Sequence, residues 1–264
     1  MSISRLIGNQ RNKDVLRRLI RRGDLGATLI FAGPSGIGKK RFAINFAKAA
    51  NCLQRPADGD DACDTCPVCE RIEAGTFSDV FVVEPDGAYI KIGQTRGMIG
   101  EVLTRPIEGK QRFFILDEAD KLRGEAATSL LKTLEEPPST STVILVTSRP
   151  DSLLSTIRSR SLKLIFSRLA DAEMTEFLRQ KGSLHEADIS LLAHLSGGRP
   201  GVAEKLDLAA YRQERQELIS LVSLIVSPRG KHRLIKAAEY YGKREREDFE
   251  RQLDLLRSIL RDMI

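Results

Sequence analysis

The feature that most constrains the fold is a glycine-rich stretch, GPSGIGKK at residues 33–40. The apolar run ATLIFAG leads into it, and the helical pattern KKRFAINFAKAAN continues from it. A buried strand, then G-x-x-x-x-G-K, then a helix is the context of a phosphate-binding Walker A loop. In such a loop the glycines let backbone N–H groups surround phosphate oxygens at the positive end of the helix. The stretch therefore predicts a strand–loop–helix unit that holds phosphate.

Further strand-like runs alternate with helical patterns along the first two thirds of the chain. The runs are DVFVVEP, RFFILDEAD, TVILVTSRP and SLKLIFS, and the helical patterns include residues 92–106 and 124–138. Strands that alternate with helices indicate crossover connections and a parallel sheet covered on both faces. We therefore expect an α/β fold.

Strand signals stop after Ser167, where short helical patterns begin at residues 171–182, 185–198 and 199–211. Longer helical patterns continue to the end of the chain and include the amphipathic segment FERQLDLLRSILRDM. These patterns predict three domains. A nucleotide-binding domain would span 1–166, a three-helix lid 167–206, and the beginning of a helical domain 207–264.

The phosphate loop departs from the usual motif at one position. Gly33, Gly36, Gly38 and Lys39 can bind nucleotide phosphates, whereas Lys40 stands where a serine or threonine normally gives its hydroxyl to Mg²⁺. A lysine ammonium carries donors only and cannot ligate a metal. We therefore expect binding of ATP or ADP at this loop to be weak or absent.

Two acidic residues follow the strand RFFILDEAD. Asp117 would hold Mg²⁺ through water, and Glu118 would polarise the attacking water. Because the direct protein ligand of the metal is missing at Lys40, we expect hydrolysis to be silent and Glu118 to be vestigial. Whether the chain is itself an enzyme stays open from the sequence.

All the cysteines of the chain lie within one short segment, at residues 52, 63, 66 and 69. The spacing C-x10-C-x2-C-x2-C lets Cys52, Cys63, Cys66 and Cys69 point at one metal ion. We predict a structural Zn²⁺ site in a module at 50–72, because four protein ligands leave no open position. An iron–sulfur cluster and free thiols are the alternatives. The piece LQRPADGDDA inside this module is the most linker-like part of the chain.

Charge and hydropathy limit the surroundings in which this chain can act. The net charge is +6, which mildly favours polyanionic partners such as nucleic acid. The arginines of VLRRLIRRG are predicted to form a solvated helix face. No apolar run reaches the ~20 residues that a membrane span needs, and no signal peptide pattern starts the chain, so we expect a cytoplasmic protein without a membrane partner.

Five of these segments, in this order, resemble the bacterial clamp-loader subunits of DNA polymerase III. They are GPSGIGKK, the four-cysteine insertion, ILDEADKL, SLLKTLEEPP and TIRSRS. The family belongs to the AAA+ ATPases, and the resemblance covers residues 1 to about 205. It implies an AAA+ fold, a helical lid, and a collar domain that begins within 207–264.

Two types within this family differ in their catalytic residues. The gamma/tau type hydrolyses ATP with a G-K-[ST] loop and a lid arginine that senses the γ-phosphate. In this chain Lys40 replaces the hydroxyl residue, and Pro200 stands about where that arginine would be, with Arg199 one position away. Both departures favour the non-hydrolysing delta-prime type.

The resemblance also implies a role for an arginine. The family's S-R-C motif carries an arginine finger for the neighbouring subunit's ATP site, and here it reads SRS, with Arg160 retained. Thr147 and Ser148 occupy the region that senses nucleotide in family members.

The resemblance therefore predicts a delta-prime subunit that lends Arg160 to a neighbour. Its partners would be gamma/tau and delta subunits in a five-membered ring, the sliding clamp indirectly, and primed DNA. A gamma/tau-type motor is the alternative. A zinc-dependent nucleic-acid-binding module is a third hypothesis, disfavoured because the segment PADGDDACDTC is acidic.

Overall fold

The computed structural model describes residues 2–56, 59–182 and 184–226, together with 252–253, 255–257 and 259–260. The chain divides into two compact units, Met1–Glu204 and Lys205–Ile264. Most of the helix predicted within FERQLDLLRSILRDM lies outside the described residues. The domain boundaries predicted near residues 166 and 206 stay predictions.

The first unit is built on a parallel sheet of five strands, which confirms the α/β fold. The strands are β1 (Thr28–Ala32), β2 (Val80–Val83), β3 (Arg112–Leu116), β4 (Ser141–Thr147) and β5 (Leu162–Ile165). Their order across the sheet is β2-β3-β4-β1-β5, and every neighbouring pair is parallel. Strands β1, β3 and β4 are fully buried, as continuous apolar runs predict for the centre of a parallel sheet.

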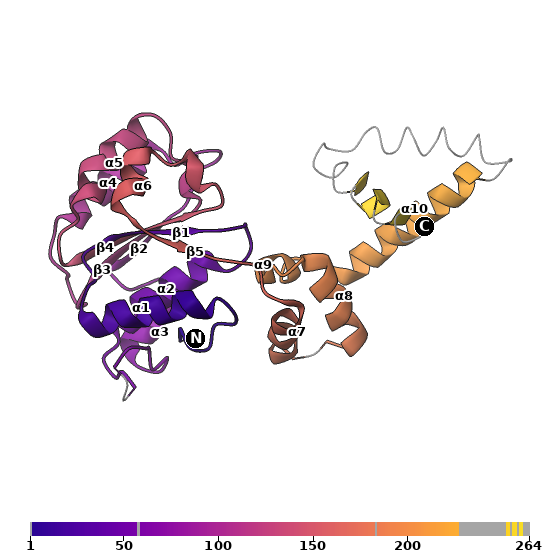
Figure 1. The fold of residues 1–264 in the computed structure, drawn as a ribbon, viewed down its shortest axis with the longest axis horizontal. Coiled ribbons are helices and arrows are strands. Elements are labelled where there is room, and N and C mark those ends of the chain that lie inside the picture. The colour runs from indigo at the N-terminus through magenta and orange to yellow at the C-terminus, as the bar shows by residue number, and fades with distance from the viewer. Residues whose placement is uncertain are drawn as a thin grey trace. The chain divides into compact units, whose positions relative to one another are not determined.

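Helices cover both faces of this sheet (Figure 1). On one face lie α1 (Gln10–Arg22), α2 (Lys39–Asn51) and α3 (Pro67–Glu73), and on the other α4 (Ile92–Val102), α5 (Glu125–Glu135) and α6 (Ser155–Arg160). Short 3₁₀ helices occur at Ala119–Lys121 and Pro150–Ser152. Each face has its own apolar core, one centred on Phe31 and Phe46 and the other on Phe114 and Leu130.

Three further helices complete the first unit, and another belongs to the second. The first unit ends with α7 (Asp171–Gln180), α8 (Glu186–Ser196) and α9 (Pro200–Ala203). In the second, α10 (Leu208–Val226) buries Leu218 with Leu255 and Ile259. The prediction of one helix across 199–211 is wrong, because the Asp207 carboxylate accepts hydrogen bonds from the N–H groups of Ala209 and Ala210 and starts a new helix.

The parallel topology determines where functional groups gather. In a parallel sheet all carboxyl ends lie at one edge, and here β1, β2, β3 and β4 lead at that edge into the phosphate loop, Glu84, Asp117 and Ser148. Among the described residues, no helix is both long and apolar enough to cross a membrane.

Candidate functional site

The phosphate loop joins β1 to α2 and has the backbone shape that such loops require. Gly33, Gly36 and Gly38 all have positive φ angles, of 155°, 80° and 90°. At Gly33 a β-carbon would collide with the carbonyl of Phe166, so only glycine fits. The loop predicted from the sequence is therefore formed, with helix α2 starting directly after Gly38.

Lys39 is folded back onto the loop that carries it. Its side chain is buried, and its Nζ donates hydrogen bonds to the carbonyl oxygens of Gly33 and Pro34, both at 2.7 Å. Burial lowers the pKa of Lys39, and the charges of Asp117 and Asp120 partly oppose that effect. The ammonium that would reach outer phosphates is satisfied by the loop's own carbonyls.

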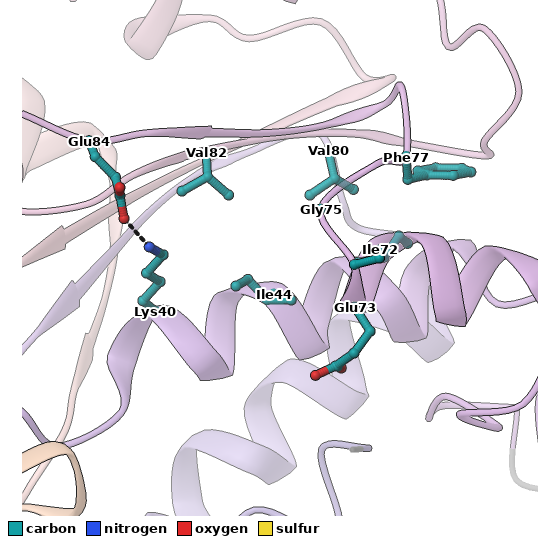
Figure 2. Close-up of a pocket in the computed structure, with 10 residues that line it drawn as sticks. Lys40, Ile44, Ile72, Glu73, Gly75, Phe77, Val80, Val82 and Glu84 are labelled. Carbon is teal, nitrogen blue, oxygen red and sulfur yellow. Dashed lines mark hydrogen bonds and ion pairs between the residues drawn. The ribbon is translucent and has the colours of Figure 1, made fainter. Parts of the chain in front are cut away.

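Lys40 forms an ion pair that the sequence did not indicate (Figure 2). It extends from the first turn of α2 to the carboxylate of Glu84, directly after β2. Its Nζ also lies 3.8 Å from Oδ2 of Asp117. A groove of about 360 Å³ starts at this pair and runs between α2 and β2, lined by apolar side chains that include Ile44, Val80 and Val82. The ammonium thus stands between two carboxylates at the carboxyl edge of the sheet.

The acidic residues after β3 have different partners. Burial raises the pKa of Asp117, and the positive charge of Lys40 works against this rise. Glu118 has a left-handed backbone, with φ 48°, and its carboxylate pairs with Lys121 at 2.5 Å. The structure therefore brings Asp117 to Lys40, while the Glu118 carboxylate is engaged by a neighbour in its own turn.

Asp120 organises the end of β4, and the sequence analysis missed it. Its Oδ1 accepts a hydrogen bond from Thr147 Oγ1 at 2.8 Å and one from the Ser148 N–H at 3.3 Å. Arg149 Nη2 lies 3.1 Å from Oδ2. Although burial raises the pKa of Asp120, the bonds from Thr147 and Arg149 lower it overall. Asp120 therefore ties the strand end that carries Ser148 to the turn that carries Asp117.

Helix α9 and the residue before it pack on the phosphate loop within the first unit. The Gly201 N–H donates to the Gly36 carbonyl at 2.8 Å, and a β-carbon on Gly36 would lie 3.1 Å from Val202. Arg199 donates its Nε–H to the Ser196 carbonyl at 3.0 Å. Beside Gly38 opens a hollow of about 450 Å³, lined by apolar and charged side chains such as Phe42, Leu169 and Lys181.

Arg160 is the last residue of α6, and its side chain is half exposed. Its Nη1 lies 3.0 Å from Oε2 of Glu135, the last residue of α5. Arg158, on the same helix, pairs instead with Asp151 at 2.7 Å. The two arginines of TIRSRS therefore have separate carboxylate partners.

The four cysteines converge on one point. Their sulfur atoms all lie within 4.8 Å of one another, and the sulfurs of Cys63 and Cys69 are 3.9 Å apart. Tetrahedral zinc with bonds of ~2.3 Å places sulfurs roughly 3.8 Å apart. Cys52 directly follows α2, and Cys66 directly precedes α3. The donor set and its spacing therefore fit a four-coordinate metal ion.

The backbone around the cysteines prepares some of them for deprotonation. The pKa of Cys63 is lowered to about 6, because hydrogen bonds from Thr65 and Cys66 outweigh the effect of burial. The pKa of Cys66 is also lowered, whereas burial raises the pKa of Cys52 and of Cys69. Because thiolates are the metal-binding form, the surroundings of Cys63 and Cys66 favour binding of a cation.

Charge pairs, each with one buried member, fasten the cysteine module to the body of the domain. Lys48 of α2 is 1% exposed and pairs with Asp64 at 3.0 Å and Glu73 at 2.6 Å. Arg17 and Arg21 of α1 pair with the buried Asp60 at 2.8 and 3.5 Å.

One prediction is confirmed in part and another is wrong. Arg18, Arg21 and Arg22 are exposed, as a solvated helix face requires, but Arg17 is partly buried, and both Arg17 and Arg21 pair with the carboxylate of Asp60. The segment LQRPADGDDA is not a linker where it is described. Asp60 and Asp61 are both buried, and Asp61 accepts backbone hydrogen bonds from Ile3 at 2.8 Å and Ser4 at 2.9 Å. These contacts could not be foreseen, because the partners lie 39 or more residues apart in the sequence.

Comparison with known proteins places the chain in a family. Residues 8–170 match the model for "DNA polymerase III, delta subunit". The chain is 31% identical over 256 residues to the DNA polymerase III subunit delta' of Bacillus subtilis, covering 95% of this chain and 75% of that protein. It is 34% identical over 197 residues to the delta' subunit of Pseudomonas aeruginosa, covering 74% of this chain and 60% of that protein. DNA polymerase III tau/gamma subunits also match.

A comparison with solved structures supports the fold. A gamma subunit-related protein of DNA polymerase III from Thermotoga maritima superposes with a TM-score of 0.51 at 20% identity. The match covers 92% of this chain and 76% of that one.

Proposed function

Because the chain belongs to the delta' subunits of the DNA polymerase III clamp loader, a branch of the AAA+ family, we propose that it hydrolyses no ATP of its own. In this proposal it lends Arg160 to the ATP site of a neighbouring subunit. It would help open the sliding clamp and place it on primed DNA.

One observation carries the proposal of a silent site: Lys40 lies between Glu84 and Asp117. A P-loop ATPase holds Mg²⁺ with a loop hydroxyl and an acidic residue at the end of a neighbouring strand. In this chain an ammonium approaches the acidic residue, and it has no lone pair for a metal. A bound Mg²⁺ would meet a like charge at close range, so the geometry opposes metal-dependent hydrolysis.

Other contacts oppose binding of the nucleotide phosphates. Lys39 gives hydrogen bonds to the carbonyls of Gly33 and Pro34, and Gly201 packs on Gly36. Arg199, the arginine nearest the expected sensor position, is bound to the Ser196 carbonyl. A nucleotide would have to displace these contacts, so ATP or ADP should bind weakly or not at all.

The exposed arginine supports the role in trans. Arg160 projects from the end of α6, and its side chain is 52% exposed. A guanidinium supplied by one subunit to another stabilises charge on the transferred phosphoryl group and can raise the rate by ~10³–10⁵ fold. Delivery requires that the side chain reach beyond its own chain, which its exposure permits.

The cysteine module would hold structural zinc. Cys52, Cys63, Cys66 and Cys69 would be its four ligands, and a site with four protein ligands has no open position for chemistry. When bound by all four cysteines, the metal would stabilise the folded conformation of the segment between α2 and α3.

The partners follow from the family. The chain is related to gamma/tau subunits, which implies a place in a clamp-loader complex. We propose a ring with gamma/tau and delta subunits that contacts primed DNA and acts in the cytoplasm, where bacterial DNA is replicated.

The decisive experiment changes Arg160→Ala in a clamp loader reconstituted from this chain and its own partner subunits. Single-turnover ATP hydrolysis at the neighbouring site should fall by roughly 10³-fold, with assembly of the complex unchanged. Arg158→Ala is the matched control, since it removes an arginine two positions away that is paired with Asp151. Unchanged hydrolysis in the Arg160→Ala complex would refute the role in trans.

The second candidate is that this chain hydrolyses ATP itself, as the gamma/tau-type motor does, and the proximity of Lys39 and Asp117 at the carboxyl edge of the sheet favours it. In that case the purified chain would hydrolyse ATP with Mg²⁺, and a change of Lys39 would abolish the activity. Hydrolysis by the chain alone would displace the proposal of a silent site.

A further inference from the structure

Glu135 holds the exposed arginine by an ion pair within this chain. Its Oε2 lies 3.0 Å from Arg160 Nη1, and the two side chains are 29% and 52% exposed. We infer that Glu135 is a positioning residue, which holds the Arg160 guanidinium in the orientation that the neighbouring subunit's nucleotide requires. The inference rests on the proposed role of Arg160 in trans.

The backbone that carries Glu135 is fixed by the core. Leu134, one residue earlier, is buried, and its carbonyl accepts a hydrogen bond from the Thr28 hydroxyl at 2.8 Å. Helix α5 ends at Glu135, before two prolines that cannot continue it. The backbone position of Glu135 is therefore set by contacts that do not involve Arg160.

The backbone that carries Arg160 is anchored in the same apolar core. Ile157 is 2% exposed and belongs to the cluster that contains Leu134. Its carbonyl accepts a hydrogen bond from the Ser161 hydroxyl at 2.7 Å, which fixes the chain on the far side of Arg160. Both ends of the ion pair are thus carried by backbone that the core holds in place, and the pair has only the two side chains to order.

An arginine side chain on a surface samples many rotamers unless something selects among them. A carboxylate carried by fixed backbone selects those that bring Nη1 toward it, which reduces the entropy lost when the guanidinium meets a phosphate. The pair with Glu135 uses Nη1, and a guanidinium has five N–H donors in all. Donors therefore remain to face phosphate oxygens while Glu135 stays bound.

A competing role for Glu135 predicts the opposite change in the rate of ATP hydrolysis at the neighbouring site. If Glu135 sequestered Arg160 away from the nucleotide, its removal would raise the rate of hydrolysis at the neighbouring site. The pair is half exposed and engages one nitrogen, so it is weak beside a charge-assisted contact to phosphate. The geometry points to orientation, and removal should lower the rate.

The test uses Glu135→Gln in the clamp loader reconstituted with its own partner subunits. The change keeps the shape of the side chain and removes its charge. Single-turnover hydrolysis at saturating ATP should fall by about fivefold, the rate equivalent of losing one half-exposed ion pair. The ATP concentration for half-maximal rate and the assembly of the complex should not change, which a general structural defect would not reproduce.

Glu136→Gln is the matched control. It makes the same chemical change one position along, at an exposed residue to which the described residues give no ion pair. It should leave the rate unaltered. A loss of rate equal to that of Glu135→Gln would overturn the inference, because the loss would then come from the change in net charge and not from the ion pair with Arg160.

Combining Glu135→Gln with Arg160→Ala separates this inference from the proposed function. Added to Arg160→Ala, Glu135→Gln should cause no further loss, since its effect runs through the arginine. Suppose that Arg160→Ala strongly lowers the hydrolysis rate while Glu135→Gln leaves it normal or raises it. The positioning role then fails and the arginine finger stands. The same conclusion follows if the two losses of rate multiply in the double variant. If Arg160→Ala is normal, the finger itself fails, and the positioning role with it.

Discussion

Helix α2 begins at the phosphate loop and ends just before Cys52, so one helix connects two places where the described residues gather cation-binding groups. At the first, the carboxylates of Glu84 and Asp117 have the ammonium of Lys40 between them. At the second, four sulfurs lie within 4.8 Å of one another. At the first place the ammonium of Lys40 offsets the charge of the carboxylates. The second place consists of four potential metal ligands.

The difference bears on the proposed function, in which the phosphate loop keeps its shape but hydrolyses no ATP. Replacing a hydroxyl with an ammonium preserves a positive charge beside Asp117, so the strand ends stay electrostatically balanced without a metal. Around the cysteine module, no lysine among the described residues pairs with a cysteine sulfur: Lys48 pairs with Asp64 and Glu73, and Lys110 donates to the Cys52 carbonyl. We therefore expect the module to depend on an external ion and the phosphate loop to be independent of one.

The largest effect should come from removing a metal ligand. Cys69→Ser should reduce bound zinc from about one ion per chain to a small fraction, because three thiolates bind far more weakly than four. The free energy of unfolding should fall by at least about 3 kcal/mol, since metal binding and folding of such modules are coupled. Elemental analysis and denaturant unfolding measure the two quantities.

The control for this change is Leu53→Ala, which alters an exposed side chain beside Cys52 and should leave the metal in place. Purified chain that carries no metal and is equally stable with a chelator would show that the cysteines are free thiols. Visible absorbance typical of an iron–sulfur cluster would show that the module holds such a cluster instead of zinc.

An intermediate effect should follow from restoring a hydroxyl to the phosphate loop. Lys40→Thr removes the ammonium and supplies the missing Mg²⁺ ligand beside Asp117. Binding of ATP should strengthen by about tenfold, or about 1.4 kcal/mol, and only when Mg²⁺ is present. Calorimetric titration of the purified variant with and without the metal measures this gain.

Lys40→Met separates the two parts of that change, because it removes the charge and adds no ligand. It should gain less affinity than Lys40→Thr. If neither variant binds ATP more tightly than the parent chain, the contacts of Lys39 and Gly201 block the site instead. Lys40 would then not explain the difference between the phosphate loop and the cysteine module.

The smallest effect concerns acid stability of the module. Burial alone would raise the pKa of Glu73, but its bonds to Lys48 and Arg41 lower it from 4.5 to about 2. A lowered carboxyl pKa stabilises the fold above the unfolded value, and that contribution disappears as the pH falls from about 4.5 toward 2.

The stability difference between the parent chain and Glu73→Gln should therefore shrink over this window. The difference at neutral pH should be about 1 kcal/mol, because the side chain is partly exposed and solvent screens the pair. Denaturant unfolding of both proteins at several pH values measures it, and Glu70→Gln, on the exposed side of α3, should show no such trend. A constant difference from pH 6 to pH 3 would contradict the assignment.

Features encoded by neighbouring residues were predictable from the sequence. The five strands, the glycine loop and the convergence of the four cysteines all follow from patterns within short segments. The contacts that explain the site were not predictable in this way. Glu84 looked like the end of a strand, Glu135 like the end of a helix, and Asp60 like part of a linker.

The sequence by itself determined the order of strands and helices, because apolar periodicity and glycine positions act over a few residues. It also determined which residues could bind phosphate or metal. The tertiary structure decided which charges meet: Lys40 with Glu84, Arg160 with Glu135, and Arg17 with Asp60. An ion pair needs two groups within about 4 Å, and only the packing of strands and helices around one sheet brings residues from distant segments that close.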